Sequence, residues 1–393
     1  MADSDARVAI TGVGVTRRAT AIDDRTAMDL QLEAALAAIG DSGRGKEEID
    51  GVITHGAGRL PRENPRAHIE LTERLGIFHK AVCLGVPAGG AAPGTAMIIA
   101  RAAIRAGRCR NVLLVDGEAG AGGEEPATSE MAAAFSGRSP SFEQPFGASA
   151  EAEFALLARR HMHDYGTTAE QLAAVVVAAS RHAALNPAAV HQDPLDIAGV
   201  LGAPTTAAPL HRPEVAPRSE GAAAMVVSAV GGRRTVEVAG LGQASTALSI
   251  SGLADRRRRP AGLTSTPGGQ AMTVALEESG LTRADLAFAQ LADDATITVL
   301  VQLEDLGFCA KGEGGPFVTA GAISLGGALP VNTHGGHLRA GRTPAGYGQW
   351  IEAVRQLRGE GGERQVPGAQ AGLVTSTAGP IAAYGAVAVL VAA

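Results

Sequence analysis

The sequence predicts an α/β protein made of two similar halves. Its 393 residues, 46% of them hydrophobic, are enough to bury more than one core. Short β-branched segments alternate with segments of helical periodicity, a pattern typical of α/β folds. The same alternation recurs in both parts of the chain, so we expect an internal duplication with residues 1–232 and 233–393 as the two halves.

The first half opens with a predicted β–α–β unit. Val8–Thr16 is a β-branched run that ends at glycines, and we interpret it as a buried parallel strand. Ala27–Ile39 has apolar residues at helical spacing and is stopped by Gly40. Ile49–Thr54 is the next strand. Residues 117–147 are rich in Gly, Ser, Pro and Glu without periodicity, which indicates a long loop excursion from this half.

The second half repeats the order strand, helix, strand. Thr235–Gly240 is strand-like, Gly268–Ser279 is helical, and Ala287–Leu291 is strand-like again. A short Gly- and Arg-containing segment precedes this repeat, so we place the boundary between the halves near Gly232.

Composition excludes several classes of protein. A net charge of −6 gives no general attraction to nucleic acid, and no base-reading motif is present. Cys83, Cys109 and Cys309 are too few and too scattered for a disulfide framework or a metal knuckle, which favours a cytoplasmic protein. His161 and His163 lack metal-ligand spacing, so we expect no metal site. The apolar runs are too short to span a membrane.

Five motifs spread over nearly the whole chain are more specific than any single glycine pattern. They are Arg159–Thr168, His182–Pro187, Ser219–Val227, Asn332–His337 and Ile351–Gly359. Together they resemble the thiolase superfamily, in the branch that contains sterol-carrier-type thiolases, lipid-transfer proteins and the aldolases that shorten steroid side chains. The resemblance implies a thiolase fold, with two duplicated βαβαβαββ halves that form a five-layered αβαβα core.

The resemblance also shows what this chain lacks. In thiolases the nucleophilic Cys lies at the start of a buried helix, whose dipole lowers the thiol pKa. Here Gly89–Gly94 precedes the helical segment Ala96–Ala106, which puts Gly90 at the Cys position. Glycine cannot form an acyl-enzyme, and Cys83 lies in or near a strand upstream. We therefore expect no Claisen chemistry by a Cys nucleophile.

Three further family site positions are altered. Ala292 replaces a polar residue that is Asn, His or Tyr in different family members, and Arg342 replaces an acid/base histidine. The stretch Thr375–Gly385 has neither the Cys nor the His that thiolases carry near the C-terminus. Four departures indicate systematic replacement of the usual catalytic residues.

Four residues remain as candidates for catalysis. His334 can act as an acid/base group, or it can hold the neighbouring turn by hydrogen bonding. Arg342 can pair with a carboxylate or thioester oxygen, or it can form a structural salt bridge. Tyr347 can supply a catalytic phenol, or it can pack at a helix start with Trp350.

Asp293 is the fourth candidate, and with Asp294 it follows a strand end, where α/β proteins place ligand contacts. The alternative is an N-cap for the helix Ala295–Leu306. Contacts to a coenzyme A thioester are expected from glycine-rich turns and their neighbours, namely Gly90, Asn332, Gly335, Gly336 and His337. Arg256–Arg259 can meet the phosphates of coenzyme A, or it can be a solvated loop.

These observations support two functions. The first is a thiolase-like acyl-CoA-binding protein that works as a retro-aldol lyase on β-hydroxyacyl-CoA thioesters, with His334 or Tyr347 as the base and backbone N–H groups near Gly90 and Gly336 for the enolate. The second is a non-catalytic thiolase-fold subunit that binds acyl-CoA or scaffolds an active partner. The resemblance implies a homodimer or heterodimer and a small OB-fold acyl-CoA-binding partner. No covalently bound cofactor is expected.

Overall fold

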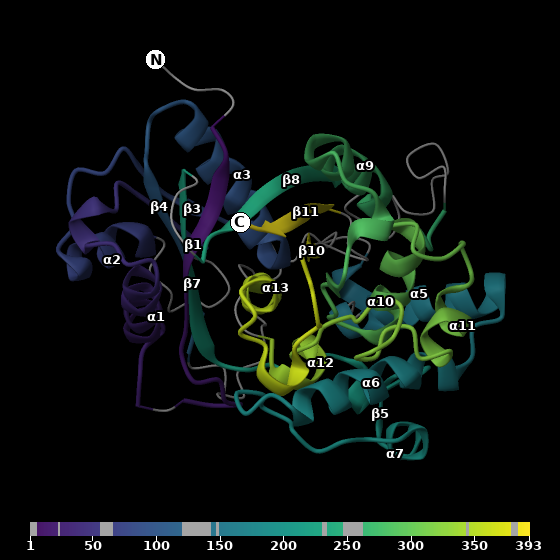
Figure 1. The fold of residues 1–393 in the computed structure, drawn as a ribbon. Helices are drawn as coiled ribbons and strands as arrows, with labels where there is room; N and C mark the ends of the chain where they lie inside the picture. The colour runs from purple at the N-terminus through teal and green to yellow at the C-terminus, as the bar shows by residue number, and fades with distance from the viewer. Residues whose placement is uncertain are drawn as a thin grey trace.

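The computed structural model describes residues 6–22, 24–55, 66–119, 143–146, 149–229, 234–246, 262–342, 346–378 and 384–393. The first half alternates strands and helices, and further helices and a short hairpin are inserted before its last strand (Figure 1). Its elements are β1 (Val8–Val15), α1 (Ala27–Asp41), β2 (Gly51–His55), α2 (Ala67–Leu75), β3 (Val82–Val86), α3 (Ala92–Arg105), β4 (Asn111–Glu118) and β7 (Gly221–Ala229). Between β4 and β7 lie α5 (Ala150–Tyr165), α6 (Ala169–Ala184), α7 (Ile197–Leu201) and the hairpin of β5 (Thr205–Ala207) with β6 (Leu210–His211).

The second half follows a similar order. Its elements are β8 (Val236–Ser245), α9 (Gly268–Ser279), β9 (Ala289–Gln290), α10 (Thr296–Asp305), α11 (Gly314–Thr319), α12 (Gly336–Ala340), α13 (Tyr347–Leu357), β10 (Ala371–Ala378) and β11 (Tyr384–Ala392). The predicted helix Gly268–Ser279 is confirmed. Ala27–Ile39 is also helical as predicted, but α1 continues through the expected stop Gly40 to Asp41, with Ser42 as its C-cap. Thr26 caps α1 with a reciprocal capping box, and Gly280 ends α9 in the left-handed conformation, as the residue types predict.

The described main strands form one nine-stranded sheet with the order β3-β2-β4-β7-β1-β8-β11-β10-β9. The first-half strands lie on one side of the β1–β8 pairing and the second-half strands on the other. This pairing is short, with Ala9 opposite Glu237 and Ile10 opposite Val236. The expectation that β1 is a parallel strand was wrong, because both of its neighbours, β7 and β8, run antiparallel to it.

Helices α3 and α13 form the central layer between the two portions of the sheet (Figure 1). Helix α3 contacts β2, β4 and β7 on one side and β10 and β11 on the other. Helix α13 contacts β1 and β7 as well as β9, β10 and β11. Met97 of α3 and Trp350 of α13 are fully buried in this shared core. Alanine is the most frequent residue of α3, and its small side chain allows the close approach of two sheet surfaces.

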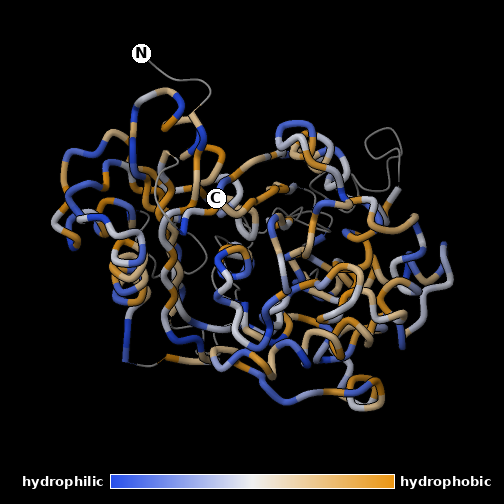
Figure 2. The backbone as a smooth tube through the Cα atoms, in the orientation of Figure 1, coloured by the Kyte–Doolittle hydropathy of each residue, from blue (hydrophilic) through white to orange (hydrophobic). Residues whose placement is uncertain are grey.

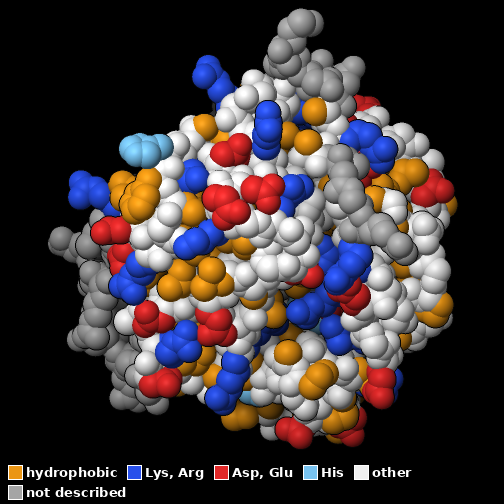
Figure 3. All heavy atoms as spheres, turned by 60° about the vertical axis from the view of Figure 1, so that its left-hand side comes forward, with side chains coloured by type: hydrophobic (Ala, Val, Ile, Leu, Met, Phe, Trp, Pro, Cys, Tyr) orange, Lys and Arg blue, Asp and Glu red, His pale blue; other side chains and the backbone are white. Residues whose placement is uncertain are grey.

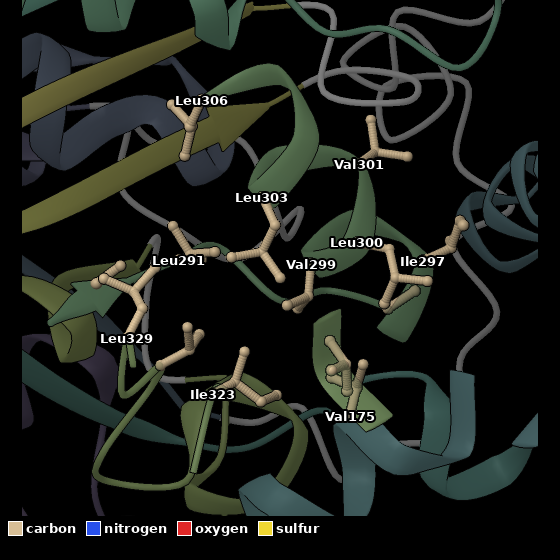
Figure 4. Packing of buried hydrophobic residues seen from close by; sticks show 14 of the residues in the cluster. Val175, Leu291, Ile297, Val299, Leu300, Val301, Leu303, Leu306, Ile323 and Leu329 are labelled. Carbon is tan, nitrogen blue, oxygen red and sulfur yellow. The ribbon is translucent and has the colours of Figure 1, made fainter. Parts of the chain in front are cut away.

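Two outer layers complete a five-layered arrangement. Helices α1 and α2 cover the outer face of the first-half strands. Helices α9 and α10 belong to the outer layer of the second half, where Leu303 lies beside Leu291 and Leu300 lies on the side of Val175 (Figure 4). Hydrophobic residues concentrate on the strands and on the inner helix faces (Figure 2). The predicted thiolase fold is therefore confirmed, whereas the boundary near Gly232 lies outside the described residues.

Candidate active site

The site lies where the starts of α3 and α13 meet the end of β10. Gly90 is in a single 3-10 turn, Gly89–Ala91, that leads directly into α3. A Cβ on Gly90 would lie closer than 3.0 Å to the carbonyl oxygen of Thr377 on β10. This separation is shorter than real Cβ contacts, so the position has no room for a side chain. The nucleophile is therefore absent, and the backbone occupies the space that its side chain would need.

Helix α13 begins next to Gly90. Its N-cap is Gly346, with φ of +83° and no side-chain hydrogen bond to the helix start. A Cβ on Gly346 would be 3.4 Å from the carbonyl oxygen of Gly90. Two helix N-termini, each carrying partial positive charge, thus converge on one region between the halves.

Asp293 is fully buried and holds the turn at Gly335 and Gly336. Its carboxylate accepts hydrogen bonds from the backbone N–H groups of His337 at 2.8 Å and Leu338 at 3.3 Å, and from the Gln349 amide at 3.1 Å. Burial raises the pKa of Asp293 to about 6, although these hydrogen bonds and His337 oppose the shift. The N-cap expected for the helix at Ala295–Leu306 was wrong for Asp293, because α10 begins without a side-chain cap and Asp293 instead caps α12.

The turn at Gly335 and Gly336 allows close approach to the backbone, as expected, but the Asp293 carboxylate already occupies that position. Gly335 and Gly336 have φ of +103° and +63°, which favours glycine. A Cβ on Gly336 would also lie closer than 3.0 Å to the Asp293 carboxylate. The N–H groups that follow Gly336 are therefore occupied by Asp293 and are not free for a substrate oxygen.

Asn332 shapes the same turn from the other side. It has φ of +51°, and its side-chain oxygen accepts a hydrogen bond from the Leu291 N–H at 2.7 Å. Its carbonyl oxygen accepts from His182 Nδ1 at 3.2 Å, while His182 Nε2 accepts from the Leu325 N–H at 3.1 Å. These two bonds fix one neutral tautomer of His182, and burial lowers the pKa of that imidazole.

His334 is buried, with 3% of its surface exposed, and neither ring nitrogen has a hydrogen-bond partner among the described residues. Its ring lies beside the first turn of α13. A Cβ on Gly348 would be 3.5 Å from His334 Nε2 and 3.3 Å from Nη2 of Arg18. Burial, and then the Arg18 guanidinium, lowers the pKa of His334 well below the usual 6.5. The imidazole is therefore neutral at neutral pH and can accept a proton.

His337 and Arg342 lie on the side of Asp293 and Asp294. The His337 Nδ1 atom is 3.8 Å from Asp293 Oδ1 and 3.7 Å from Asp294 Oδ1. Arg342, with 40% of its side chain exposed, forms an ion pair with Asp294 at 3.2 Å. Arg342 was expected either to contact a carboxylate or thioester oxygen of a ligand or to form a structural salt bridge, and the structure shows the salt bridge.

Tyr347 is the first residue of α13 and is 1% exposed in the shared core. Burial, and then the nearby Asp116 carboxylate, raises the pKa of Tyr347 well above 10.0. The phenol is therefore protonated at neutral pH. Trp350 lies one turn further along and donates a hydrogen bond to Ser376 of β10 at 2.8 Å, so both aromatic residues pack at the helix start.

Sequence reasoning missed two residues near this site. Arg18 lies a few residues after the end of β1 at Val15, and the only local signal was the pair Arg17-Arg18 after a strand. Asp116 is a buried acidic residue in β4, and its place directly after the apolar run Val112–Val115 was a usable signal. Its Oδ2 atom is 4.0 Å from Nδ1 of His55 at the end of β2.

A small pocket adjoins Thr377 on the side of α9. It is partly open to solvent and is lined mostly by apolar groups, including Pro267, Leu306 and Val387. Figure 3 shows another feature of the molecular surface, a hollow around which Lys and Arg side chains gather. The charged run Arg256–Arg259 lies outside the described residues, as does the end of the Thr375–Gly385 stretch.

Among the residues that the structure describes, no three His, Cys, Asp or Glu side chains are grouped so that they could hold a metal ion. Within the same ranges, no helix has the length and apolar character needed to cross a membrane.

Residues 242–391 match the family described as thiolase C-terminal domain-like. Over 364 residues the chain is 32% identical to a steroid side-chain-cleaving aldolase of Thermomonospora curvata, which covers 89% of this chain and 90% of that protein. It is also 32% identical to a 17-hydroxy-3-oxo-4-pregnene-20-carboxyl-CoA lyase of Mycobacterium tuberculosis, over 95% of this chain and 97% of that protein. Among solved structures, an Ltp2-ChsH2 aldolase matches with a TM-score of 0.85 and 30% identity, over 100% of this chain and 99% of that chain.

Proposed function

The chain belongs to the thiolase superfamily, in the branch of the steroid side-chain aldolases, and from this premise we propose that it is a retro-aldol lyase acting on β-hydroxyacyl-CoA thioesters. Two relatives that match nearly the whole chain are named as an aldolase and as a CoA lyase. Neither name requires a Cys nucleophile, which agrees with the lack of space at Gly90. The observation that carries the proposal is His334, a neutral and buried base without a hydrogen-bond partner, beside the converging helix starts.

The proposed reaction breaks the bond between the α and β carbons of the substrate. A base takes the proton of the β-hydroxyl group, the O–H electron pair forms a carbonyl, and the electrons of the broken bond pass to the thioester as an enolate. Protonation of the α carbon then releases a shortened acyl-CoA. The start of α3 at Gly90 is the site that we assign to the enolate oxygen, because a helix N-terminus favours negative charge.

The pKa directions separate the two candidate bases. The lowered pKa of His334 leaves a neutral imidazole that can accept the hydroxyl proton. The raised pKa of Tyr347 keeps its proton in place at neutral pH, which suits a hydrogen-bond donor and not a base. We therefore assign the base to His334 and a donor role to Tyr347.

The other predicted site residues have supporting roles in this proposal. Asp293 is engaged with backbone N–H groups at α12, so we assign it a positioning role in place of a catalytic one. Asn332, Gly335, Gly336 and His337 shape the turn that carries His334. Arg342 is engaged with Asp294, and contact of this arginine with the thioester would need that ion pair to open.

Turnover assays test the proposed reaction. The purified chain, alone and mixed with a small OB-fold acyl-CoA-binding protein, is incubated with β-hydroxyacyl-CoA thioesters, and release of ketone or aldehyde is measured with the shortened acyl-CoA. His334→Ala should reduce turnover by at least about 100-fold, the usual contribution of a general base, with an unchanged circular dichroism spectrum. His163→Ala, an exposed histidine on α5, is the matched control. Absence of product in both mixtures would refute the lyase activity.

A second function is favoured by the loss of the usual thiolase site residues. Gly90 has no room for a nucleophile and Arg342 is held in an ion pair, so the usual thiolase chemistry is not available to the chain. A non-catalytic subunit that binds acyl-CoA for a partner fits these facts. Saturable binding of acyl-CoA without turnover in any mixture would identify this function.

Assembly belongs to the same proposal. The neighbouring solved structure carries two names, Ltp2 and ChsH2, and this supports a heteromeric complex for the present chain. Strand β3 lies at the edge of the described sheet, so a second copy can pair there and form a homodimer. Light scattering of the chain alone and with the OB-fold protein distinguishes monomer, homodimer and heteromer. The three cysteines are unpaired, which supports the proposed cytoplasmic location.

A further inference from the structure

Cationic side chains outnumber carboxylates around His334. Arg18, Arg355 and Arg364 all lower the pKa of His334. Arg364 is paired with Glu352, at 2.9 Å and 3.0 Å. Arg18 and Arg355 are half-buried and form no ion pair within 4.0 Å in the described ranges. Glu352, which Arg364 already engages, raises the pKa of both from a greater distance, so positive charge remains in excess around His334. Charges that are removed from water are normally paired, and an unmatched cation in a site indicates that an anion binds there.

The environment of Arg18 supports this interpretation. Burial, and then the charge of Arg355, lowers the pKa of Arg18 to about 10. Its one hydrogen bond in the described structure is long, from Nη1 to the carbonyl oxygen of Ala340 at 3.5 Å. Asp116 and Asp293, the carboxylates near the start of α13, form no ion pair with it. Arg18 is therefore held at the site and keeps most of its hydrogen-bonding capacity.

Three groups face the same point next to the first turn of α13. The Cβ position of Gly348 is 3.3 Å from Arg18 Nη2 and 3.5 Å from His334 Nε2. Helix α13 has 11 residues, and its N-terminus has no side-chain cap. His334 is buried and has no hydrogen-bond partner among the residues described. A guanidinium, an imidazole and a helix N-terminus thus border one location.

We propose that Arg18, His334 and the start of α13 form a binding site for an oxygen anion, and that this site receives the β-oxygen of the CoA thioester. This inference rests on the lyase function proposed above. Gly346, the N-cap of α13, approaches the carbonyl oxygen of Gly90 at the start of α3, so the proposed anion site and the start of α3 lie in one region of the protein.

The site gives Arg18 a direct catalytic role. As His334 takes the hydroxyl proton, negative charge develops on the β-oxygen, and the Arg18 guanidinium stabilises that alkoxide until the carbon–carbon bond breaks. The electron pair then becomes part of the new carbonyl group. The proton on His334 is available for the α carbon of the enolate, so the step needs no oxidant, reductant or further reactant.

Two CoA thioesters of the same size test the site without turnover. Malonyl-CoA carries a carboxylate at the β carbon, whereas acetoacetyl-CoA carries a neutral methyl ketone there. Calorimetric titration of the wild-type protein should give about tenfold tighter binding of malonyl-CoA, as expected for charge-assisted hydrogen bonds. Equal affinities would overturn the anion site and leave the lyase function standing. Failure of both thioesters to bind would overturn the CoA-thioester premise itself.

Variants of Arg18 separate a site residue from a structural one. Arg18→Met should weaken malonyl-CoA binding about tenfold and leave acetoacetyl-CoA binding within about threefold, while Arg18→Lys should retain part of the preference. Arg74→Met, which removes an exposed arginine from α2, is the matched control and should retain the wild-type preference. If Arg18→Met does not fold, the titration of Arg18→Lys against the wild type still tests whether Arg18 contributes to the preference for malonyl-CoA. A malonyl-CoA preference that persists in both Arg18 variants would exclude Arg18 from the site.

Discussion

Substitution of Gly90 by alanine tests whether the nucleophile position is truly closed. The added Cβ would lie closer than 3.0 Å to the carbonyl oxygen of Thr377. That oxygen belongs to the backbone of β10, where Thr377 pairs with Gly385 of β11, so it cannot rotate away as a side chain would. The start of α3 and the end of β10 must separate by several tenths of an ångström or more.

The magnitude follows from two opposing terms. Overpacking of a close contact costs about 1 to 3 kcal/mol, and a backbone neighbour places this case toward the upper end. Replacing glycine by alanine restricts the unfolded chain and stabilises by about 0.4 to 1 kcal/mol. We therefore expect Gly90→Ala to lower the free energy of unfolding by about 2 kcal/mol.

Urea unfolding followed by circular dichroism measures this change. The matched control is Gly40→Ala in α1, where a Cβ would meet nothing within 4 Å and where the residue is exposed in a helix. That substitution should stabilise the protein by about 0.5 to 1 kcal/mol, because alanine is the better helix former. If Gly90→Ala is as stable as the wild type while Gly40→Ala gains the expected stability, the reasoning is refuted. For the same steric reason, Gly90→Cys should not create thiolase activity.

Two further predictions concern pH. The pKa of Asp293 is raised from 3.8 to about 6 in the folded protein, so the wild-type protein loses stability as pH rises between these values. Asp293→Asn cannot ionise and lacks this loss. Between pH 4 and pH 8 its free energy of unfolding, measured in urea titrations, should therefore rise by about 2 kcal/mol relative to that of the wild type. A constant difference between the two proteins across that range would contradict this. If His334 is the base and Tyr347 the donor, kcat/KM should stay level from pH 6.5 to 10.0 and fall only outside it. An acidic limb above pH 6.5 would exclude His334 as the base.

Local periodicity was sufficient to place the main elements. Helices α1 and α9 and the segment that leads from Gly90 into α3 were predictable, because helical spacing and stop residues are encoded within a few turns. The direction of β1 relative to its neighbours was not predictable from the same pattern. Its partner β7 comes more than 200 residues later, and a short apolar run is compatible with either direction.

The site was predictable in part, for a similar reason. His334, Gly336 and Tyr347 were found because they lie in or near one motif that resembles the family. Asp293 was interpreted either as a ligand contact or as an N-cap of the helix that follows it in sequence, whereas the N–H group that it binds belongs to His337, 44 residues away. Arg18 was missed because its hydrogen-bond acceptor, Ala340, is 322 residues away and because Arg17 beside it looks the same in sequence. Contacts at such separation are set by tertiary packing.

The central position of α3 and α13 has a consequence for how the chain folds. Each helix buries one side against first-half strands and the other side against second-half strands, so neither half contains a complete core of its own. Duplication in sequence therefore does not give two autonomous folding units. We expect the two halves to unfold together in one cooperative transition, because separating them would expose the apolar faces of both central helices to water.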